Sequence, residues 1–207
     1  ALVDLGAAPS GAAEILVALP TFEPYLQAAR AMGARIVSIP ATPDFSFPLD
    51  AVLRAVTPNT RIVYVNNPNN PTGQPIPQGA IRRVAREAGH ALVFVDEAYH
   101  DFMDENFLAE AASYPNVMVG RTFSKAYGLA GLRVGYAVGD PDIITALGKV
   151  YVPFSATSIS QAAAIASLDA ADELLARTDA VIAERARVTA ALRDAGYTVP
   201  PSQANFV

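Results

Sequence analysis

Lys125 is the side chain in this sequence best suited to covalent chemistry with a carbonyl compound. It is one of only two lysines, the other being Lys149, and every other basic residue except histidine is an arginine. Thr122 and Ser124 stand beside it, and a glycine-punctuated turn leads from it to Arg133. Lysine amines form imines with carbonyls, and arginine holds phosphate. The stretch therefore predicts a Schiff-base lysine next to a phosphate site; the alternative is a surface lysine in a polar loop.

Asp96 is the second candidate, because it ends an apolar run. Residues 93–95 are Val, Phe and Val, and a carboxylate there is costly unless it has a cationic partner. A protonated pyridine nitrogen is such a partner, and Tyr99 could donate its phenol to a ring oxygen. The alternatives for Asp96 and Glu97 are a helix cap or a magnesium ligand of an NTPase. The NTPase requires a phosphate loop of the form GxxxxGK(S/T), which the sequence lacks, so we expect no metal site.

Residues 66–73, with the sequence NNPNNPTG, form the third candidate. Asparagine, proline and glycine populate ordinary turns, so a plain turn is the alternative. The length of the stretch and its two Asn-Pro pairs favour a rigid loop that presents a side-chain amide, that of Asn70.

The elements that must position these residues follow from apolar runs bounded by proline and glycine. We expect Thr21 and Asp140 to cap helices, and a helix break near Ala170. The alternation predicts an α/β domain with a largely parallel sheet covered by helices on both faces. Strands are expected at residues 14–19, 35–40, 61–66, 91–95, 117–119 and 132–138, with a further strand beginning at 205–207, and helices at 22–32, 49–56, 77–88, 141–150, beyond Pro153, and 172–195.

The Asn-Pro loop that carries Asn70, the residue Asp96 and the stretch 122–125 that ends at Lys125 each follow after one of the predicted strands. In open α/β sheets, ligands bind at the carboxyl ends of the strands. The sequence therefore predicts that an amide, a carboxylate and an amine meet at one rim of the sheet.

Composition limits the remaining possibilities. The chain has 207 residues, of which 52% are hydrophobic and 17% charged, with a net charge of −5. No basic run favours a nucleic-acid partner, and no apolar run approaches the roughly 18 residues of a membrane span. Cysteine is absent, which excludes thiolate chemistry and fits a cytoplasmic protein. We expect the sequence to be an interior segment of a longer protein, because it begins without methionine and in the middle of a pattern.

The three motifs together resemble a known family. NPNNPTG at residues 67–73, DEAY at 96–99 and TFSKAYGLAGLRVG at 122–135 are similar to motifs of the pyridoxal-phosphate aminotransferases of fold type I. Within them, the chain most resembles the histidinol-phosphate and aromatic amino acid (phenylalanine) aminotransferase branch. The resemblance covers nearly the whole sequence and implies the large domain of that fold.

The resemblance also implies a role for each motif residue. Lys125 forms an imine with pyridoxal phosphate and then serves as general base and acid. Asp96 keeps the pyridine nitrogen protonated, so that the ring accepts electrons. Asn70 and Tyr99 are implied to contact the ring 3-oxygen, and Thr122, Ser124 and Arg133 to contact the phosphate. Phe22 is implied to stack on the ring face; the alternative is that Phe22 is a core residue at the start of a helix.

Domain organisation and partners are also implied. Residues 1–170 correspond to the large, cofactor-binding domain without its N-terminal part, and residues 171–207 to the long interdomain helix and the start of a small domain. An upstream phosphate loop, the arginine for the substrate carboxylate and a tyrosine of the partner subunit lie outside the segment, and the parent protein is expected to be a homodimer.

The expected reaction moves an amino group between an L-amino acid, aromatic by resemblance, and a 2-oxo acid. A histidinol-phosphate aminotransferase of histidine biosynthesis is the first alternative. The others are a lyase or decarboxylase on the same fold and a transcription regulator with an aminotransferase-like effector domain.

Overall fold

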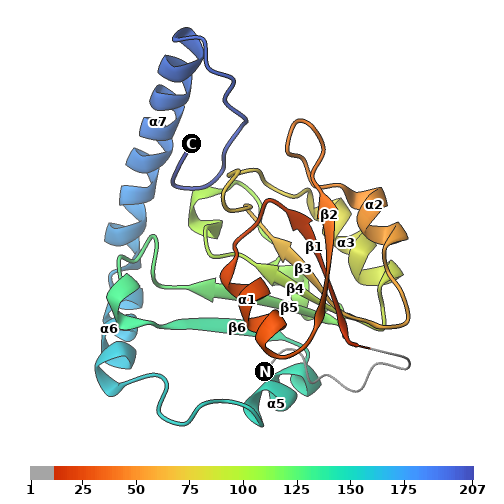
Figure 1. The fold of residues 1–207 in the computed structure, drawn as a ribbon. Helices are drawn as coiled ribbons and strands as arrows, with labels where there is room; N and C mark the ends of the chain where they lie inside the picture. The colour runs from red at the N-terminus through yellow and green to blue at the C-terminus, as the bar shows by residue number, and fades with distance from the viewer. Residues whose placement is uncertain (1–11) are drawn as a thin grey trace.

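The computed structural model describes residues 12–207, which form a six-stranded sheet with helices packed on it (Figure 1). The N-terminal residues that suggested an interior segment lie outside this range. Strands β1 to β5 are parallel, and β6 pairs antiparallel with β5. The order across the sheet is β2-β1-β3-β4-β5-β6. The strands are β1 Glu14–Leu19, β2 Arg35–Pro40, β3 Thr60–Asn66, β4 Leu92–Asp96, β5 Val117–Thr122 and β6 Gly135–Gly139.

The helices of the described residues alternate with these strands in the chain. None of them is both long enough and apolar enough to cross a membrane. They are α1 Pro24–Ala31, α2 Leu49–Arg54, α3 Gln78–Glu87, α4 Leu108–Ala111, α5 Pro141–Gly148, α6 Ser158–Asp169 and α7 Ala171–Asp194, with the 3-10 helices η1 His100–Phe102 and η2 Ala130–Leu132.

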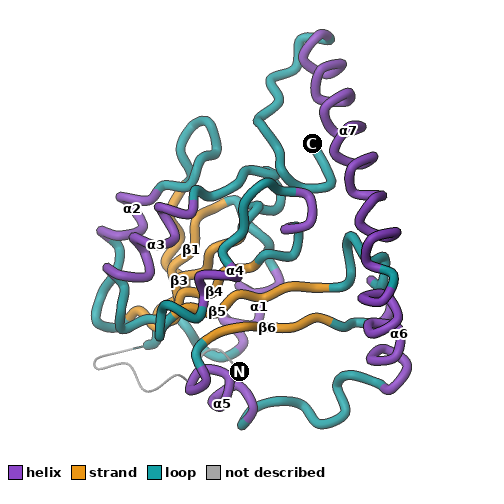
Figure 2. Tube along the Cα trace, turned by 180° about the vertical axis from the view of Figure 1, so that it is seen from behind, coloured by secondary structure: helices purple, strands orange, loops and turns teal. Residues whose placement is uncertain are grey.

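The sheet separates two hydrophobic layers, because successive side chains of a strand point to opposite faces. On one face, Val63 and Val93 belong to a layer that α2, α3 and α4 cover. On the other face, Tyr64 and Phe94 pack with α1 through Leu26 and with α5. Figures 1 and 2 show the sheet from the two sides. The expected α/β architecture, with helices on both faces of a mostly parallel sheet, is confirmed.

The last helix and the segment after it matter for the site. The helix break near Ala170 is confirmed, since α6 ends at Asp169 and α7 begins at Ala171. In both views, α7 extends well beyond the sheet, and the chain after it turns back toward the carboxyl ends of the strands (Figures 1 and 2).

Four local expectations need correction. The first helix begins at Pro24 and not at residue 22, so Thr21 does not cap it, and no side chain caps this helix. Leu132 lies in η2, and the sixth strand begins only at Gly135. The chain from 150 to 157 is not helical, and residues 205–207 form no strand. A strand needs hydrogen bonds from a neighbouring strand, and no strand of the described residues pairs with 205–207.

The N-cap at Asp140 is confirmed. Its side chain accepts a hydrogen bond from the Asp142 backbone N–H, and Pro141 occupies the first turn of α5. This capping fixes the start of the helix that follows β6.

Candidate functional site

A cavity of about 580 Å³ opens where β3, β4 and β5 end and β6 begins. All eight side chains that the sequence singled out line it, so the predicted convergence of separate strand ends is confirmed. Other lining residues include Tyr25, Phe94 and Tyr136. The predicted residues are Phe22, Asn70, Asp96, Tyr99, Thr122, Ser124, Lys125 and Arg133.

Asp96 is the buried charge of the cavity, with 7% of its surface exposed. Its Oδ2 accepts a hydrogen bond of 3.1 Å from the Tyr64 hydroxyl, and its Oδ1 accepts one of 3.0 Å from the Ala98 backbone N–H. Burial raises the pKa of the carboxyl, whereas these hydrogen bonds and the positive charge of Lys125 act in the opposite direction. A cation bound beside Asp96 would therefore stabilise its ionised form.

Tyr64 and Tyr25 surround this carboxylate with phenols that stay protonated. Burial, and then the negative charge of Asp96, raise the pKa of both hydroxyls. The two rings also pack on each other, with centroids 5.0 Å apart, and Tyr25 meets the Phe94 ring edge-on at 5.5 Å. Both phenols thus act as hydrogen-bond donors to Asp96. The Tyr25 and Phe94 rings line the cavity, and the Tyr64 ring packs against both of them.

Asn70 and Tyr99 form a polar pair at the rim. The Asn70 side-chain amide donates a hydrogen bond of 3.1 Å to the Tyr99 hydroxyl. The exposed Lys125 lies close by, with its Nζ 5.0 Å from the centre of the Tyr99 ring. An amide, a phenol and an amine therefore lie within reach of one small molecule in the cavity.

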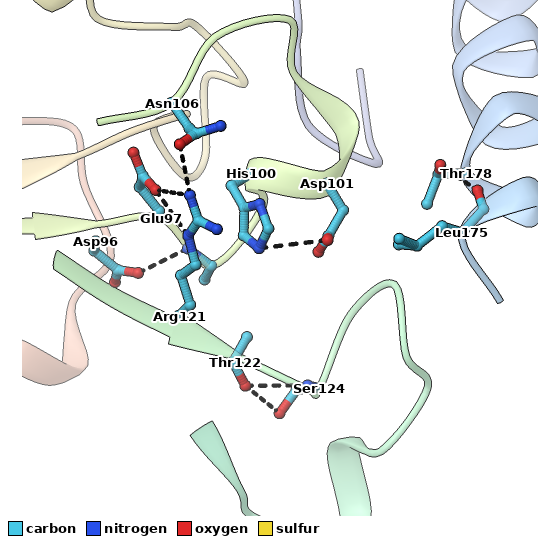
Figure 3. Close-up of polar contacts among 11 residues, drawn as sticks. Asp96, Glu97, His100, Asp101, Asn106, Arg121, Thr122, Ser124, Leu175 and Thr178 are labelled. Carbon is cyan, nitrogen blue, oxygen red and sulfur yellow. Dashed lines mark hydrogen bonds and ion pairs between the residues drawn. The ribbon is translucent and has the colours of Figure 1, made fainter. Parts of the chain in front are cut away.

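Hydroxyl and guanidinium donors gather near the end of β5. The Thr122 hydroxyl donates to the Ser124 hydroxyl at 2.8 Å and accepts a hydrogen bond of 3.0 Å from the Ser124 backbone N–H (Figure 3). Arg133 lines the same cavity in a left-handed backbone conformation, with φ of 51°, and its guanidinium donates to the Ala130 carbonyl at 2.8 Å. Such a set of donors suits an anion such as a phosphate group.

Beside the cavity, which Arg121 also lines, a buried ion pair joins the ends of β4 and β5. Glu97 is fully buried, and its Oε2 accepts hydrogen bonds of 2.9 and 2.7 Å from the Arg121 guanidinium (Figure 3). The other Glu97 oxygen accepts the Phe107 backbone N–H, and Arg121 also donates to the Asn106 side chain at 2.8 Å. Burial raises the pKa of Glu97, while the Phe107 N–H and Arg121 counteract it.

Comparison with known proteins identifies the family. The sequence pattern of the class I and II aminotransferases matches residues 3–207. The chain belongs to this family. The aromatic amino acid aminotransferase of Mycolicibacterium smegmatis is 59% identical over 199 residues, which are 94% of this chain and 55% of that protein. The protein of the same name from Mycobacteroides abscessus is 58% identical over 198 residues, 94% of this chain and 57% of that protein. The chain thus spans about half the length of the curated relatives it matches.

Solved aminotransferase structures share the fold. The structure of the histidinol-phosphate aminotransferase of Sinorhizobium meliloti was determined in complex with pyridoxal-5′-phosphate. It matches this chain with a TM-score of 0.85 and 32% sequence identity, and the match covers 98% of this chain and 55% of the Sinorhizobium chain. The expected fold type I large domain and the resemblance to both enzyme branches are confirmed.

Three contributors to the site of this aminotransferase chain are not among the eight predicted residues. The sequence places Tyr64 on a strand near the cofactor ring without a partner, and its contact with Asp96 depends on the register that pairs Asn66 with Asp96. From sequence, Tyr25 is expected only to pack or to form part of the pocket wall. The pairing of Glu97 with Arg121 spans 24 residues; the available signal was that a carboxylate ending an apolar strand needs a cationic partner.

Proposed function

We propose that this chain is the cofactor-binding part of a pyridoxal-phosphate-dependent aminotransferase that moves an amino group between an aromatic L-amino acid and a 2-oxo acid. The observation that carries the proposal is the meeting of Lys125, Asp96, the Asn70–Tyr99 pair and the Thr122–Ser124–Arg133 donors in one cavity, in a chain of this family. The identity of 59% with an aromatic amino acid aminotransferase supports the substrate class.

The residues present fit pyridoxal phosphate. When bound, this cofactor supplies a carbonyl carbon that condenses with amines and a protonated ring that accepts electrons. Burial raises the pKa of Asp96, and a pyridinium nitrogen would supply the positive charge that stabilises its ionised form. Thr122, Ser124 and Arg133 offer the donors that a phosphate needs, and the Asn70–Tyr99 pair offers donors for the ring 3-oxygen.

The chain's own residues would divide the work as follows. Lys125 would supply the amine that bonds to the cofactor carbonyl carbon, and the same amine would move a proton to and from the substrate α-carbon. Asp96, with its ionised form stabilised by a bound pyridinium nitrogen, would orient the ring. Phe22 lies at the cavity with 39% of its surface exposed, free to pack on a ring face. Because Lys125 is exposed to the cavity, it can reach both cofactor and substrate.

A histidinol-phosphate aminotransferase is the second candidate, supported by the structural similarity to the Sinorhizobium meliloti enzyme. The identity of 59% with an aromatic amino acid aminotransferase favours the first candidate. Steady-state assays of the full-length protein with phenylalanine and with histidinol phosphate, each with a 2-oxo acid acceptor, separate the two. We expect a higher kcat/KM for phenylalanine; a preference of about 100-fold for histidinol phosphate, or about 2.7 kcal/mol, would overturn the assignment.

The homodimer is part of the proposal. Residues 150–154 form an apolar stretch between α5 and α6, in which Val152 is 69% and Phe154 95% exposed. An exposed apolar patch of this kind marks an interaction surface. The cytoplasmic location and the division into residues 1–170 and 171–207 stay predictions.

A further inference from the structure

We propose that residues 202–206, which follow the long helix α7, hold the Asn70–Tyr99 pair in place from outside the cavity. This inference rests on the proposed function, because it assigns positioning residues to the pair that would bind the ring 3-oxygen. None of residues 202–206 lines the cavity, so they act through Asn70 and Tyr99 and not on the cofactor.

The first contact fixes the loop that carries Asn70. The Gly73 backbone N–H donates to the Asn69 carbonyl at 2.7 Å and closes a turn around Asn70. The Gly73 carbonyl then accepts a hydrogen bond of 2.7 Å from the Gln203 backbone N–H. Gly73 has φ of 69°, and a Cβ added to it would lie 2.1 Å from the Ser202 Oγ. Only glycine lets the 202–206 segment approach this loop so closely.

The second contact fixes Tyr99. The Phe206 ring meets the Tyr99 ring edge-on, with centroids 5.2 Å apart and an interplanar angle of 89°. Ala204 is fully buried in the same cluster, together with Phe102. An edge-to-face aromatic pair of this geometry restricts the Tyr99 ring, and the Tyr99 hydroxyl is the acceptor for Asn70.

Hydrogen bonds within residues 202–206 and from α7 fix the conformation of this segment. The Ser202 hydroxyl donates to the Phe206 carbonyl at 2.6 Å and accepts the Ala204 backbone N–H at 3.2 Å. From α7, Arg185 donates to the Ala204 carbonyl at 2.8 Å and to the Phe102 carbonyl at 3.0 Å. Both members of the Asn70–Tyr99 pair are therefore held by one segment, which α7 fixes in turn.

Amide hydrogen exchange of the full-length protein, prepared free of cofactor, tests the positioning directly. We expect Phe206→Ala to accelerate exchange about fivefold in peptides covering residues 67–74 and 98–103, since an aromatic pair contributes about 1 kcal/mol. Val207→Ala, at a neighbouring residue that is 47% exposed, is the matched control and should change neither peptide.

Gly73→Ala provides the second variant. Gly33→Ala is its control, because Gly33 has a similar φ of 76° and a Cβ there meets nothing within 4 Å. Gly73→Ala should accelerate exchange at 67–74 while Gly33→Ala leaves it unchanged. After cofactor is added, Phe206→Ala should also shift the visible absorbance band, because the donors to the ring 3-oxygen are less well fixed, whereas a general loss of stability would not move that band.

The possible results separate this inference from the proposed function. Wild-type exchange rates at 67–74 in both Phe206→Ala and Gly73→Ala, or equal acceleration in the Val207→Ala control, would overturn the positioning role. A wild-type protein that takes up no cofactor would overturn the proposed function instead, while the exchange result in the cofactor-free protein would still decide whether the segment holds the loop.

Discussion

Asp96 and Tyr64 form the part of the site in which a phenol hydrogen bond lowers the pKa of a buried carboxyl group. Burial raises the pKa of Asp96, and the 3.1 Å hydrogen bond from Tyr64 works against that rise. Tyr64 keeps its proton because burial and the neighbouring carboxylate raise its own pKa. The phenol is therefore a permanent donor that favours the ionised form of Asp96.

Replacing Tyr64 by phenylalanine removes this donor and keeps the ring in its aromatic cluster. The pKa of Asp96 then rises further, and the carboxylate is lost at a higher pH. Since a hydrogen bond to a charged group contributes about 1.5 kcal/mol, the acid limb of the kcat/KM profile should move up by about one pH unit. The measurement is the pH–rate profile of the full-length protein beside Tyr197→Phe, an exposed tyrosine that should leave the profile unchanged. An unmoved acid limb in Tyr64→Phe would mean that Asp96 does not depend on this phenol.

Many residues of the site can be predicted from the sequence. Asp96 can be found because it ends an apolar run, whereas Asn70 and Lys125 lie in polar stretches that follow apolar runs, and the spacing from Lys125 to Arg133 completes a known motif. Tyr64 and Tyr25 could not be found in the same way. Tyrosine is common in strands and helices, and only the packing of β3, β4 and α1 brings these two hydroxyls to the Asp96 carboxylate.

The strands β4 and β5 hold the functional groups at a fixed distance. The two strands are parallel neighbours, and the Glu97 backbone N–H extends their pairing by donating to the Gly120 carbonyl at 2.9 Å. Asp96 and Glu97 are adjacent, so their side chains point to opposite faces. Asp96 lines the cavity and Glu97 does not. Glu97 instead binds Arg121 (Figure 3). The buried ion pair therefore couples the end of β4 to the residue that precedes Thr122.

The Glu97–Arg121 pair makes a prediction about stability. Glu97→Gln leaves the Arg121 guanidinium without its carboxylate in a largely buried position, since only 8% of the Arg121 side chain is exposed. Breaking one partner of a buried ion pair costs about 3 kcal/mol or more in the free energy of unfolding. Glu173→Gln is the control: Glu173 pairs with Arg177 at the surface, where both side chains are more than half exposed, and its loss should cost below about 1 kcal/mol. Denaturant unfolding measures both, and equal losses would contradict the structural role given to Glu97.

The positions of the strands can be predicted from the sequence, but the direction of β6 and the contacts of residues 202–206 cannot. Apolar runs predicted the position of every strand of the sheet, and burial explains this best for the central strands β3, β4 and β5. They could not give the direction of β6, which depends on the short connection through η2 that returns the chain beside β5. Nor could they reveal that residues 202–206 support the Asn70 loop. The backbone hydrogen bond between Gln203 and Gly73 does not depend on side-chain type and so cannot be predicted from the pattern of apolar and polar residues.

The exposed apolar surface around residues 150–154 leads to a prediction for the whole molecule. Phe154, 95% exposed, and Val152, 69% exposed, would be covered in a homodimer. Phe154→Asp adds a charge where an apolar contact is expected, and should shift the full-length protein from dimer toward monomer in sedimentation velocity. Met32→Asp, at the end of α1 and 56% exposed, is the matched control and should remain dimeric. A wild-type protein that sediments as a monomer, or a fully dimeric Phe154→Asp, would exclude this surface.

Lys125 is the residue proposed to bond covalently to pyridoxal phosphate, and reduction with borohydride shows whether it does. The full-length protein is mixed with pyridoxal phosphate, reduced, digested and analysed by mass spectrometry, beside the variants Lys125→Ala and Lys149→Ala. We predict a visible absorbance band before reduction and a single phosphopyridoxyl group afterwards on the peptide that contains Lys125. Lys149→Ala should retain both, and Lys125→Ala should lose both. A protein that stays colourless with the cofactor, or that carries the label on another residue while Lys125 remains free, would contradict the account.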